Sequence, residues 1–218
     1  MKFKASVIIS VYDNTRLLKP VLDSLKQQTE KNFEIIISED GQSEEMKTFV
    51  ADYPFMNDFQ HLTQEDNGWQ KNKALNNAIR HATSDWLIFI DGDCVLHPRF
   101  VEMHLRFAGE TVILAGKRVK LDSETSLFLE NNMPEAIGEM QKKCIRKLFT
   151  GRGKTTFIEE SIFISPDGWL RFIPGLRKAN RLTGSNMSFS KKAIYAINGF
   201  DEEYTLPAVG EDTDLFWR

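Results

Sequence analysis

The first ninety residues alternate between short apolar runs and amphipathic stretches, and this alternation limits the fold more than any other feature of the chain. Ala5–Val11 is almost continuously apolar and β-branched, which is typical of a strand buried on both faces of a parallel sheet. Similar runs occupy Phe33–Ser38 and Trp86–Ile90, and a weaker one spans Phe59–Thr63. Leucine and valine repeat at helical spacing over residues 17–25. Strand and helix in alternation predict an α/β fold with a mostly parallel central sheet.

Capping residues indicate where several helices begin. Asn14, Ser43 and Ser190 each precede a helical pattern, and their side-chain oxygens can accept a hydrogen bond from the first turn. The helix after Ser190 is expected over residues 191–197, with Gly199 as its C-terminal stop. A further helix is expected over Lys71–Ala82.

Charge and cysteine usage exclude several classes of protein. The 218 residues carry a formal charge of −3 and no long basic run, which argues against a nucleic-acid partner. Cys94 and Cys144 have no paired spacing, so the sequence indicates neither a disulfide framework nor a zinc site. The N-terminal apolar run, about six residues long, is too short for a signal segment or a membrane span. We therefore expect a cytoplasmic protein, and peripheral contact with the inner face of the plasma membrane stays open.

Three acidic clusters lie at the ends of predicted strands or before a predicted helix. One alone has an ordinary explanation, since Asp-Gly is common in turns and Glu-Asp is common at helix starts. In a parallel sheet, however, ligands bind beyond the carboxyl ends of the strands. Carboxylates gathered there suit Mg²⁺ or Mn²⁺, which can bridge a diphosphate. The clusters are Glu39-Asp40, Asp91-Gly92-Asp93 and Glu211-Asp212.

Five strings, in this order, carry a resemblance to a known family: VIISVYDN, SEDG, FIDGDCVLHP, TGSNMSFSKKAIYAINGFDEEY and GEDTDLFWR. Together they resemble the family-two glycosyltransferases of the GT-A type, a single Rossmann-like nucleotide-diphospho-sugar transferase fold, and most closely the bacterial chondroitin-polymerase type. The resemblance implies a metal-dependent inverting enzyme that uses Mn²⁺ or Mg²⁺. It would move a hexose or N-acetylhexosamine from a UDP-sugar to a hydroxyl of a saccharide or lipid-linked acceptor, in synthesis of a bacterial surface polysaccharide.

The resemblance assigns roles to residues of the donor site. Ser10 matches a nucleotide contact, and Val11 and Tyr12 follow it in the same motif. Asp40 matches the acid that accepts the N3 hydrogen of uracil, a hydrogen that neutral cytosine lacks. Asp93 matches the metal ligand. Asp91, with Gly92 beside it, matches the partner acid near the ribose or the waters of the metal, and we count it as a second candidate ligand.

The catalytic base is also assigned by resemblance. Asp212 matches the carboxylate that removes the acceptor hydroxyl proton, and the adjacent Glu211 could instead hold the acceptor. The two roles can be exchanged, because geometry decides a base before pKa does.

The resemblance implies further contacts with the donor, in a segment whose sequence departs from the family pattern at two positions. The string GWQKNKALNNAI resembles a segment under the nucleotide that ends in Ala-Arg-Asn-x-Gly, and here Leu75 replaces the arginine and Ala78 the glycine. Either Lys71 or Lys73 could restore the positive charge, or both could belong to a solvated helix face. The remaining expected contacts are Asn76 in this segment and the sugar-facing loop residues Gly184, Ser185 and Asn186.

Aromatic and histidine side chains leave two readings open. Trp69 and Trp217 could stack on sugar or base, or pack in the core. His97 and His104 are expected to be surface or packing residues, because the family takes its histidine ligand from beyond the Glu-Asp motif.

We interpret the chain as two regions. Residues 1–117 form the α/β half that binds the nucleotide sugar, and residues 118–218 form an acceptor-side region that returns to the sheet. A short strand is expected over 112–116 and another over 183–189, with a helix over 134–149 between them. Glycines and prolines interrupt the rest of 120–180.

Two other functions compete with the transferase. A nucleotidyltransferase of similar fold would show a glycine-rich basic loop after the first strand, where this chain has VYDN. A sugar-nucleotide-binding domain without activity would be expected to have lost one acidic cluster, and all three are present.

The position of the last residue gives a further expectation. The chain ends at Arg218, within the second turn of the helix that Glu211-Asp212 opens. In the relatives the chain continues to a histidine that completes the metal site. We therefore expect a truncated piece of a longer enzyme that binds UDP and metal weakly. The oligomeric state is left undetermined.

Overall fold

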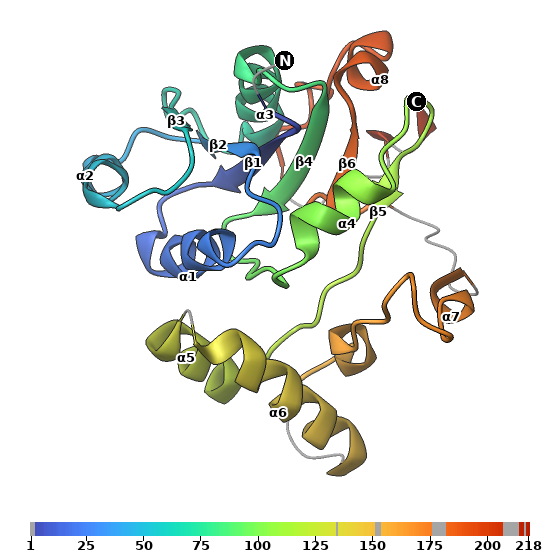
Figure 1. Ribbon diagram of the computed structural model, residues 1–218. Coiled ribbons are helices and arrows are strands. Elements are labelled where there is room, and N and C mark those ends of the chain that lie inside the picture. The colour runs from blue at the N-terminus through green and yellow to red at the C-terminus, as the bar shows by residue number, and fades with distance from the viewer. Residues whose placement is uncertain (1–2, 134, 151–153, 176–181, 207–213, 216) are drawn as a thin grey trace.

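A six-stranded sheet in the order β3-β2-β1-β4-β6-β5 forms the centre of the molecule (Figure 1). The computed structural model describes residues 3–133, 135–150, 154–175, 182–206, 214–215 and 217–218. Four strands run parallel, and β6 pairs antiparallel with both β4 and β5. The predicted mostly parallel α/β fold is confirmed. The strands are β1 (Ala5–Val11), β2 (Phe33–Glu39), β3 (Phe59–Leu62), β4 (Trp86–Asp91), β5 (Leu114–Ala115) and β6 (Met187–Ser190).

Helices connect and flank the strands, and three of them begin at the predicted caps. Asn14 Oδ1 accepts a hydrogen bond from Leu17 N at 3.0 Å at the start of α1. The hydroxyl of Ser43 accepts from Met46 N at the start of α2, and that of Ser190 accepts from Ala193 N at the start of α8. The helices are α1 (Thr15–Lys26), α2 (Glu44–Asp52), α3 (Lys71–His81), α4 (Phe100–Arg106), α5 (Ser123–Asn132), α6 (Ala136–Thr150), the 3₁₀ helix η1 (Ile158–Ser161), α7 (Phe172–Gly175) and α8 (Lys191–Ala196).

Apolar side chains of alternating strand residues fill a core on each face of the sheet. Val7 and Ile9 of β1 pack with α1, whereas Ile8 between them packs with α3. All three are fully buried. Because both faces are covered, the strands read as continuous apolar runs, and this explains why the sequence predicted the bounds of β1 correctly.

The region between β5 and β6 has a small core of its own. Leu129 of α5 packs with Met140 and Cys144 of α6, separately from the two sheet cores. Figure 1 shows α5 and α6 below the sheet, on the side of α1. An ion pair of 3.0 Å from Arg16 to Glu130 joins α1 to α5.

The structure corrects the end of this region. Residues 183–186 were expected to open the strand over 183–189, but they form a turn in which Asn186 N donates to Thr183 O at 2.9 Å, and β6 begins at Met187. No helix among the described residues is long and apolar enough to cross a membrane.

Candidate active site at the carboxyl edge of the sheet

A cleft of about 480 Å³ opens beyond the carboxyl ends of β1, β2 and β4. Parallel strands end at one edge of a sheet, so residues that follow different strands meet there. The lining includes the motif residues expected from three of the sequence strings. They are Ser10, Val11 and Tyr12 after β1, Asp40 after β2, and Asp91, Gly92 and Asp93 at the end of β4; Asn14, Leu17, Gly68, Trp69 and Lys71 complete the lining.

Asp91 is held between two cations. Its Oδ1 lies 2.8 Å from the ammonium of Lys71 on α3, and its Oδ2 lies 3.6 Å from the guanidinium of Arg118. Both lysine and carboxylate are largely shielded from solvent, with side-chain exposures of 21% and 27%. The structure therefore favours Lys71 over Lys73 as the positive charge at the cleft.

Asp93 is the exposed carboxylate of the pair. Oxygens of Asp91 and Asp93 and the sulfur of Cys94 lie within 4.8 Å of one another, a spacing that one divalent cation can span. Two carboxylates fit Mg²⁺ or Mn²⁺, which prefer hard oxygen ligands. Burial, with Asp93 and Asp91 nearby, raises the pKa of Cys94 to about 12, so the thiol stays protonated and donates to Asp93 Oδ1 at 3.2 Å.

Gly92 lets β4 end close to β1. A Cβ at this position would lie 2.6 Å from Val11 Cγ1, closer than side-chain carbons approach. The Gly92 amide also donates to the Ser10 carbonyl at 2.8 Å. A glycine between the two aspartates therefore allows their backbone to close over the first strand.

Asp40 is 6% exposed, and its carboxylate is fixed by two amide donors. Oδ1 accepts from Gln64 Nε2 at 2.7 Å, and Oδ2 accepts from Gln70 N at 2.8 Å. Each carboxylate oxygen has a second lone pair, so the group can accept a further hydrogen from a ligand.

Glu39, the neighbour of Asp40 in the same acidic cluster, has a structural role. Successive side chains of a strand point to opposite faces, so Glu39 and Asp40 cannot both face the cleft. Glu39 is 1% exposed, pairs with His61 Nε2 at 2.7 Å, and accepts from Ser43 N at the start of α2.

Two aromatic side chains form part of the cleft wall. Tyr12 is 53% exposed, and its hydroxyl donates to Asp66 at 2.8 Å, a contact that raises the pKa of the phenol. Trp69 is half-buried in the lining. Trp217 is 79% exposed, so it is not a core residue.

Two expected donor contacts of α3 lie outside the cleft. Among the described residues, the cleft lining excludes Lys73 and Asn76. Lys73 is exposed and its ammonium lies 3.4 Å from Gln70 Oε1. The Asn76 amide instead fixes the chain after α8, because it donates to Phe200 O and accepts from Phe200 N.

The expected sugar-facing loop lies at the same sheet edge, because β6 is antiparallel and its amino end meets the carboxyl ends of the others. The loop residues are likewise not part of the cleft lining, and Ser185 and Asn186 line a neighbouring cavity instead. Ser185 is buried and accepts from Arg118 at 2.6 Å. The Asn186 side chain contacts His104 and Lys117. Gly184 lies in the turn before them. Glu211 and Asp212, the expected base and its neighbour, lie outside the described residues.

Arg118 is a site residue that the sequence reading missed. It follows β5, which runs parallel to β4, so its position past a strand end is the signal that could have found it.

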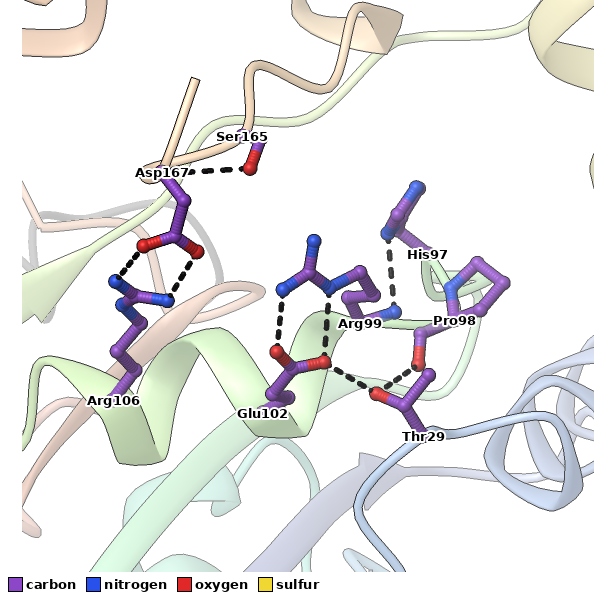
Figure 2. A network of polar contacts seen from close by, with 8 residues as sticks. All are labelled: Thr29, His97, Pro98, Arg99, Glu102, Arg106, Ser165 and Asp167. Carbon is purple, nitrogen blue, oxygen red and sulfur yellow. Dashed lines mark hydrogen bonds and ion pairs between the residues drawn. The ribbon is translucent and has the colours of Figure 1, made fainter. Parts of the chain in front are cut away.

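A second, larger cavity of about 730 Å³ adjoins the cleft at Leu17 and Asp93. Residues 160–164 and helix α6 form part of its wall. Figure 2 shows how the chain that follows these residues is held against α4: Arg106 makes two hydrogen bonds to Asp167, of 2.8 and 2.6 Å. Phe163 also stacks on His97 with 4.7 Å between ring centroids.

Comparison with known proteins decides the family. The sequence model described as "Glycosyl transferase family 2" matches residues 6–171. The chain belongs to this family. The match includes the ends of β1, β2 and β4 that build the cleft, and the expected resemblance to the chondroitin-polymerase type is confirmed.

Curated relatives of this family-two chain are longer proteins. It is 26% identical to a chondroitin synthase of Escherichia coli over 98% of the chain, which is 32% of that protein. It is 24% identical to a hyaluronan synthase of Pasteurella multocida over 98% of the chain and 22% of that protein. The chain thus spans about a third or less of the length of these synthases.

Solved structures support the GT-A fold. The family-two chain superposes on Staphylococcus aureus TarS 1-349 in complex with UDP-GlcNAc with a TM-score of 0.62 and 19% identity, covering 98% of this chain and 52% of that one. It superposes on a mannosyltransferase from Pyrobaculum calidifontis, in complex with GDP-Man and Mn²⁺, with a TM-score of 0.55 and 14% identity, covering 97% and 50%. At these identities the likeness extends to the fold alone.

Proposed function

We propose that this chain is the catalytic domain of an inverting glycosyltransferase that moves a sugar from a UDP-sugar to a hydroxyl of a saccharide or lipid-linked acceptor. The observation that carries the proposal is the meeting of Asp40, Asp91 and Asp93 in one cleft with Lys71. This set supplies an acceptor for a base, two carboxylates for a cation and a positive charge for a diphosphate.

The uracil end of the donor is assigned to Asp40. Its buried carboxylate is held in place by Gln64 and Gln70, so it is preorganised to accept a hydrogen from a ring nitrogen. Uracil carries a hydrogen on N3 and neutral cytosine does not, which favours UDP over CDP. The exposed ring of Tyr12 offers an apolar face beside it.

The diphosphate end is assigned to Asp93, Asp91 and Lys71. Asp93 and Asp91 would hold Mn²⁺ or Mg²⁺, which supplies neutralisation of the charge on the departing diphosphate. Lys71 adds a second positive charge at the same end of the cleft. Arg118 and Lys71 together keep Asp91 oriented, and this leaves exposed Asp93 as the more available ligand.

In the chemical step, a base activates the acceptor on the side of the sugar opposite the leaving group. The acceptor oxygen forms a bond to the anomeric carbon while the bond from that carbon to the β-phosphate oxygen breaks, and the electron pair leaves with UDP. Asp212 takes the acceptor proton, and Glu211 holds the acceptor or exchanges roles with it. Attack from the face opposite the leaving group inverts the configuration.

The acceptor and the setting are proposed from the second cavity and the relatives. That cavity meets the cleft at Asp93, so a saccharide within it would reach the donor sugar. The relatives are named as chondroitin and hyaluronan synthases, which supports a role in bacterial surface polysaccharide synthesis. We place this activity at the cytoplasmic side of the membrane, where nucleotide sugars are available.

Release of UDP from a panel of UDP-sugars in the presence of Mn²⁺ tests the proposal. We expect UDP with at least one sugar and a product of opposite anomeric configuration by NMR. UDP binding without release from any sugar would instead indicate a binding domain. Formation of UTP from UDP-sugar and pyrophosphate would indicate a nucleotidyltransferase.

Asp212→Asn should lower transfer by about 10²-fold or more while UDP binding stays nearly intact, as expected when a positioned base is lost. If this variant keeps full activity and Glu211→Gln does not, the base is Glu211.

A further inference from the structure

His104 of α4 is a buried histidine that lies outside the donor cleft, and it joins two residues of the β6 segment. Its side chain is buried, and burial lowers its pKa to about 4, so the imidazole is neutral at physiological pH. Nε2 lies 3.1 Å from Asn186 Oδ1, and Nδ1 lies 2.7 Å from Ser188 Oγ. Ser188 is fully buried as well.

The hydrogen bonds of Asn186 fix the tautomer of this imidazole. Asn186 Nδ2 donates to the Lys117 carbonyl at 3.1 Å, so the oxygen of the amide must be the atom that faces His104. An amide oxygen only accepts, and Nε2 therefore carries the hydrogen. The unprotonated Nδ1 then accepts from the Ser188 hydroxyl.

Asn186 in turn connects the turn before β6 to the end of β5. The backbone carbonyl of Asn186 accepts from Gly116 N at 2.9 Å, and its backbone N–H donates to Thr183 O at 2.9 Å. The Asn186 side chain packs against the same segment, because a Cβ on Gly116 would lie 2.1 Å from Asn186 Nδ2. A shift of Asn186, backbone and side chain together, would therefore disturb both the turn and the chain that leaves β5.

Arg118 lies two residues beyond Gly116 and ends this set of contacts at the cleft. Its guanidinium donates to Ser185 Oγ at 2.6 Å and lies 3.6 Å from Asp91 Oδ2. The position of Arg118 thus depends on the turn through Ser185 and on β5 through its own backbone.

We propose that His104, as the Nε2–H imidazole, is a positioning residue that holds Asn186 and thereby places Ser185, whose hydroxyl holds Arg118 beside Asp91. His104 touches no reacting group in this arrangement. Its effect on turnover rests on the proposed glycosyl transfer, whereas the tautomer and the order of the turn are properties of the free protein. Small displacements of groups around a reacting centre lower rates strongly.

Two substitutions separate the two ring nitrogens. In His104→Gln, the side-chain amide can place a donor near the position of Nε2 and keep the bond to Asn186. In His104→Asn, the shorter amide reaches only the position of Nδ1, so it keeps the contact with Ser188 and loses Asn186. Both variants replace the imidazole with a smaller amide, so a general packing defect would appear in both.

Amide hydrogen exchange in the free protein is the first measurement. We expect His104→Asn to speed exchange at Gly116 and Asn186 by about tenfold or more, while His104→Gln stays within about threefold of the unsubstituted protein and the amides of β1 do not change in either. Equal acceleration in the two variants, or none in both, would overturn the proposal.

Turnover is the second measurement. We expect His104→Asn to lower kcat about tenfold with the Kd for UDP changed by less than about twofold, and His104→Gln to retain most of kcat. If kcat falls in both variants in proportion to their loss of thermal stability, the role of His104 is merely structural. If the unsubstituted protein transfers no sugar, the proposed function fails while the exchange result still decides the role of His104.

Nitrogen NMR of the imidazoles keeps the proposal testable if neither variant folds. The chain has four histidines, and the buried one is expected to show hydrogen on Nε2. Hydrogen on Nδ1 would contradict the arrangement.

Discussion

The Lys71 ammonium and the Asp91 carboxylate form an ion pair of 2.8 Å in the lining of the cleft. Arg118 approaches the other oxygen of the same carboxylate at 3.6 Å. The two cations hold Asp91 in place, whereas Asp93 stays exposed. Under the proposed function, Asp93 is therefore the more available ligand for a divalent ion.

Replacing Lys71 with methionine should weaken UDP binding. The change removes a positive charge from the proposed diphosphate end of the cleft. The negative charge of Asp91 is then balanced by Arg118 alone of the two cations beside it. We expect affinity in the presence of Mn²⁺ to fall about tenfold by calorimetry, which corresponds to ~1.4 kcal/mol. Lys73→Met is the matched control, because it removes the same charge from the same helix outside the cleft lining. Equal losses in the two variants would show that Lys71 acts only through net charge.

The choice between these lysines shows what the sequence could not decide. Residues two apart on a helix are rotated by about 200°, so only one of the pair can face the cleft. The pattern of α3 placed both on its polar surface, and only the approach of β4 identifies which one meets Asp91. The bounds of β1 and the helix starts were predictable because buried apolar runs and capping side chains are local features.

The elements in the middle of the chain were less predictable, because few of them are specified by local features. Of the helices in this region, only α6 had a clear apolar pattern, and it spans Ala136–Thr150 where 134–149 was expected. The short strand expected over 112–116 contains only Leu114–Ala115 in the sheet. These elements depend on contacts with distant segments, such as that of Arg106 with Asp167, which no local pattern specifies.

Binding of UDP should require a divalent cation through Asp93. We expect EDTA to weaken UDP binding by the unsubstituted protein and to have no further effect on Asp93→Ala, because the variant has lost its exposed ligand. Calorimetric titrations with and without Mn²⁺ measure both. Equal affinity of the unsubstituted protein in EDTA and Mn²⁺ would contradict the metal assignment.

Asp40→Asn should reduce the preference for UDP over CDP. The asparagine keeps the shape of the side chain but replaces one accepting oxygen with a donor, which opposes either Gln64 Nε2 or Gln70 N. We expect about tenfold weaker UDP binding and a UDP-to-CDP ratio closer to one, at a cost of ~1–2 kcal/mol in UDP binding free energy. An unchanged ratio would show that another group recognises the base.

Gly92→Ala should destabilise the fold and distort the cleft. The added Cβ would lie 2.6 Å from Val11 Cγ1, so β1 or β4 must shift. We expect a loss of about 1–3 kcal/mol in the free energy of unfolding, measured in urea. Gly138→Ala is the control, since nothing lies within 4 Å of its Cβ position in α6. That substitution should be neutral or stabilising by up to ~1 kcal/mol.

The network in Figure 2 gives a prediction on pH. Hydrogen bonds from Arg99 and then from Thr29 lower the pKa of Glu102 to about 2, against an ordinary value of 4.5. A carboxylate whose pKa is lower in the folded protein stabilises the fold above pH 4.5, and that stabilisation is lost as the pH falls from there through about 2. The side chain of Glu102 is 32% exposed, so solvent screening limits the contribution to about 0.5–1 kcal/mol.

Glu102→Gln isolates this contribution from those of the other carboxylates. We expect the variant to be less stable than the unsubstituted protein at pH 7, and the difference in free energy of unfolding to shrink steadily from pH 4.5 toward pH 2. The control is Glu203→Gln, which changes an exposed carboxylate in the segment after α8 and should alter stability by less than ~0.5 kcal/mol at every pH. A difference for Glu102→Gln that stays constant down to pH 2 would show that the side chain stabilises α4 through shape, because an ion pair with Arg99 must weaken once the carboxylate is protonated.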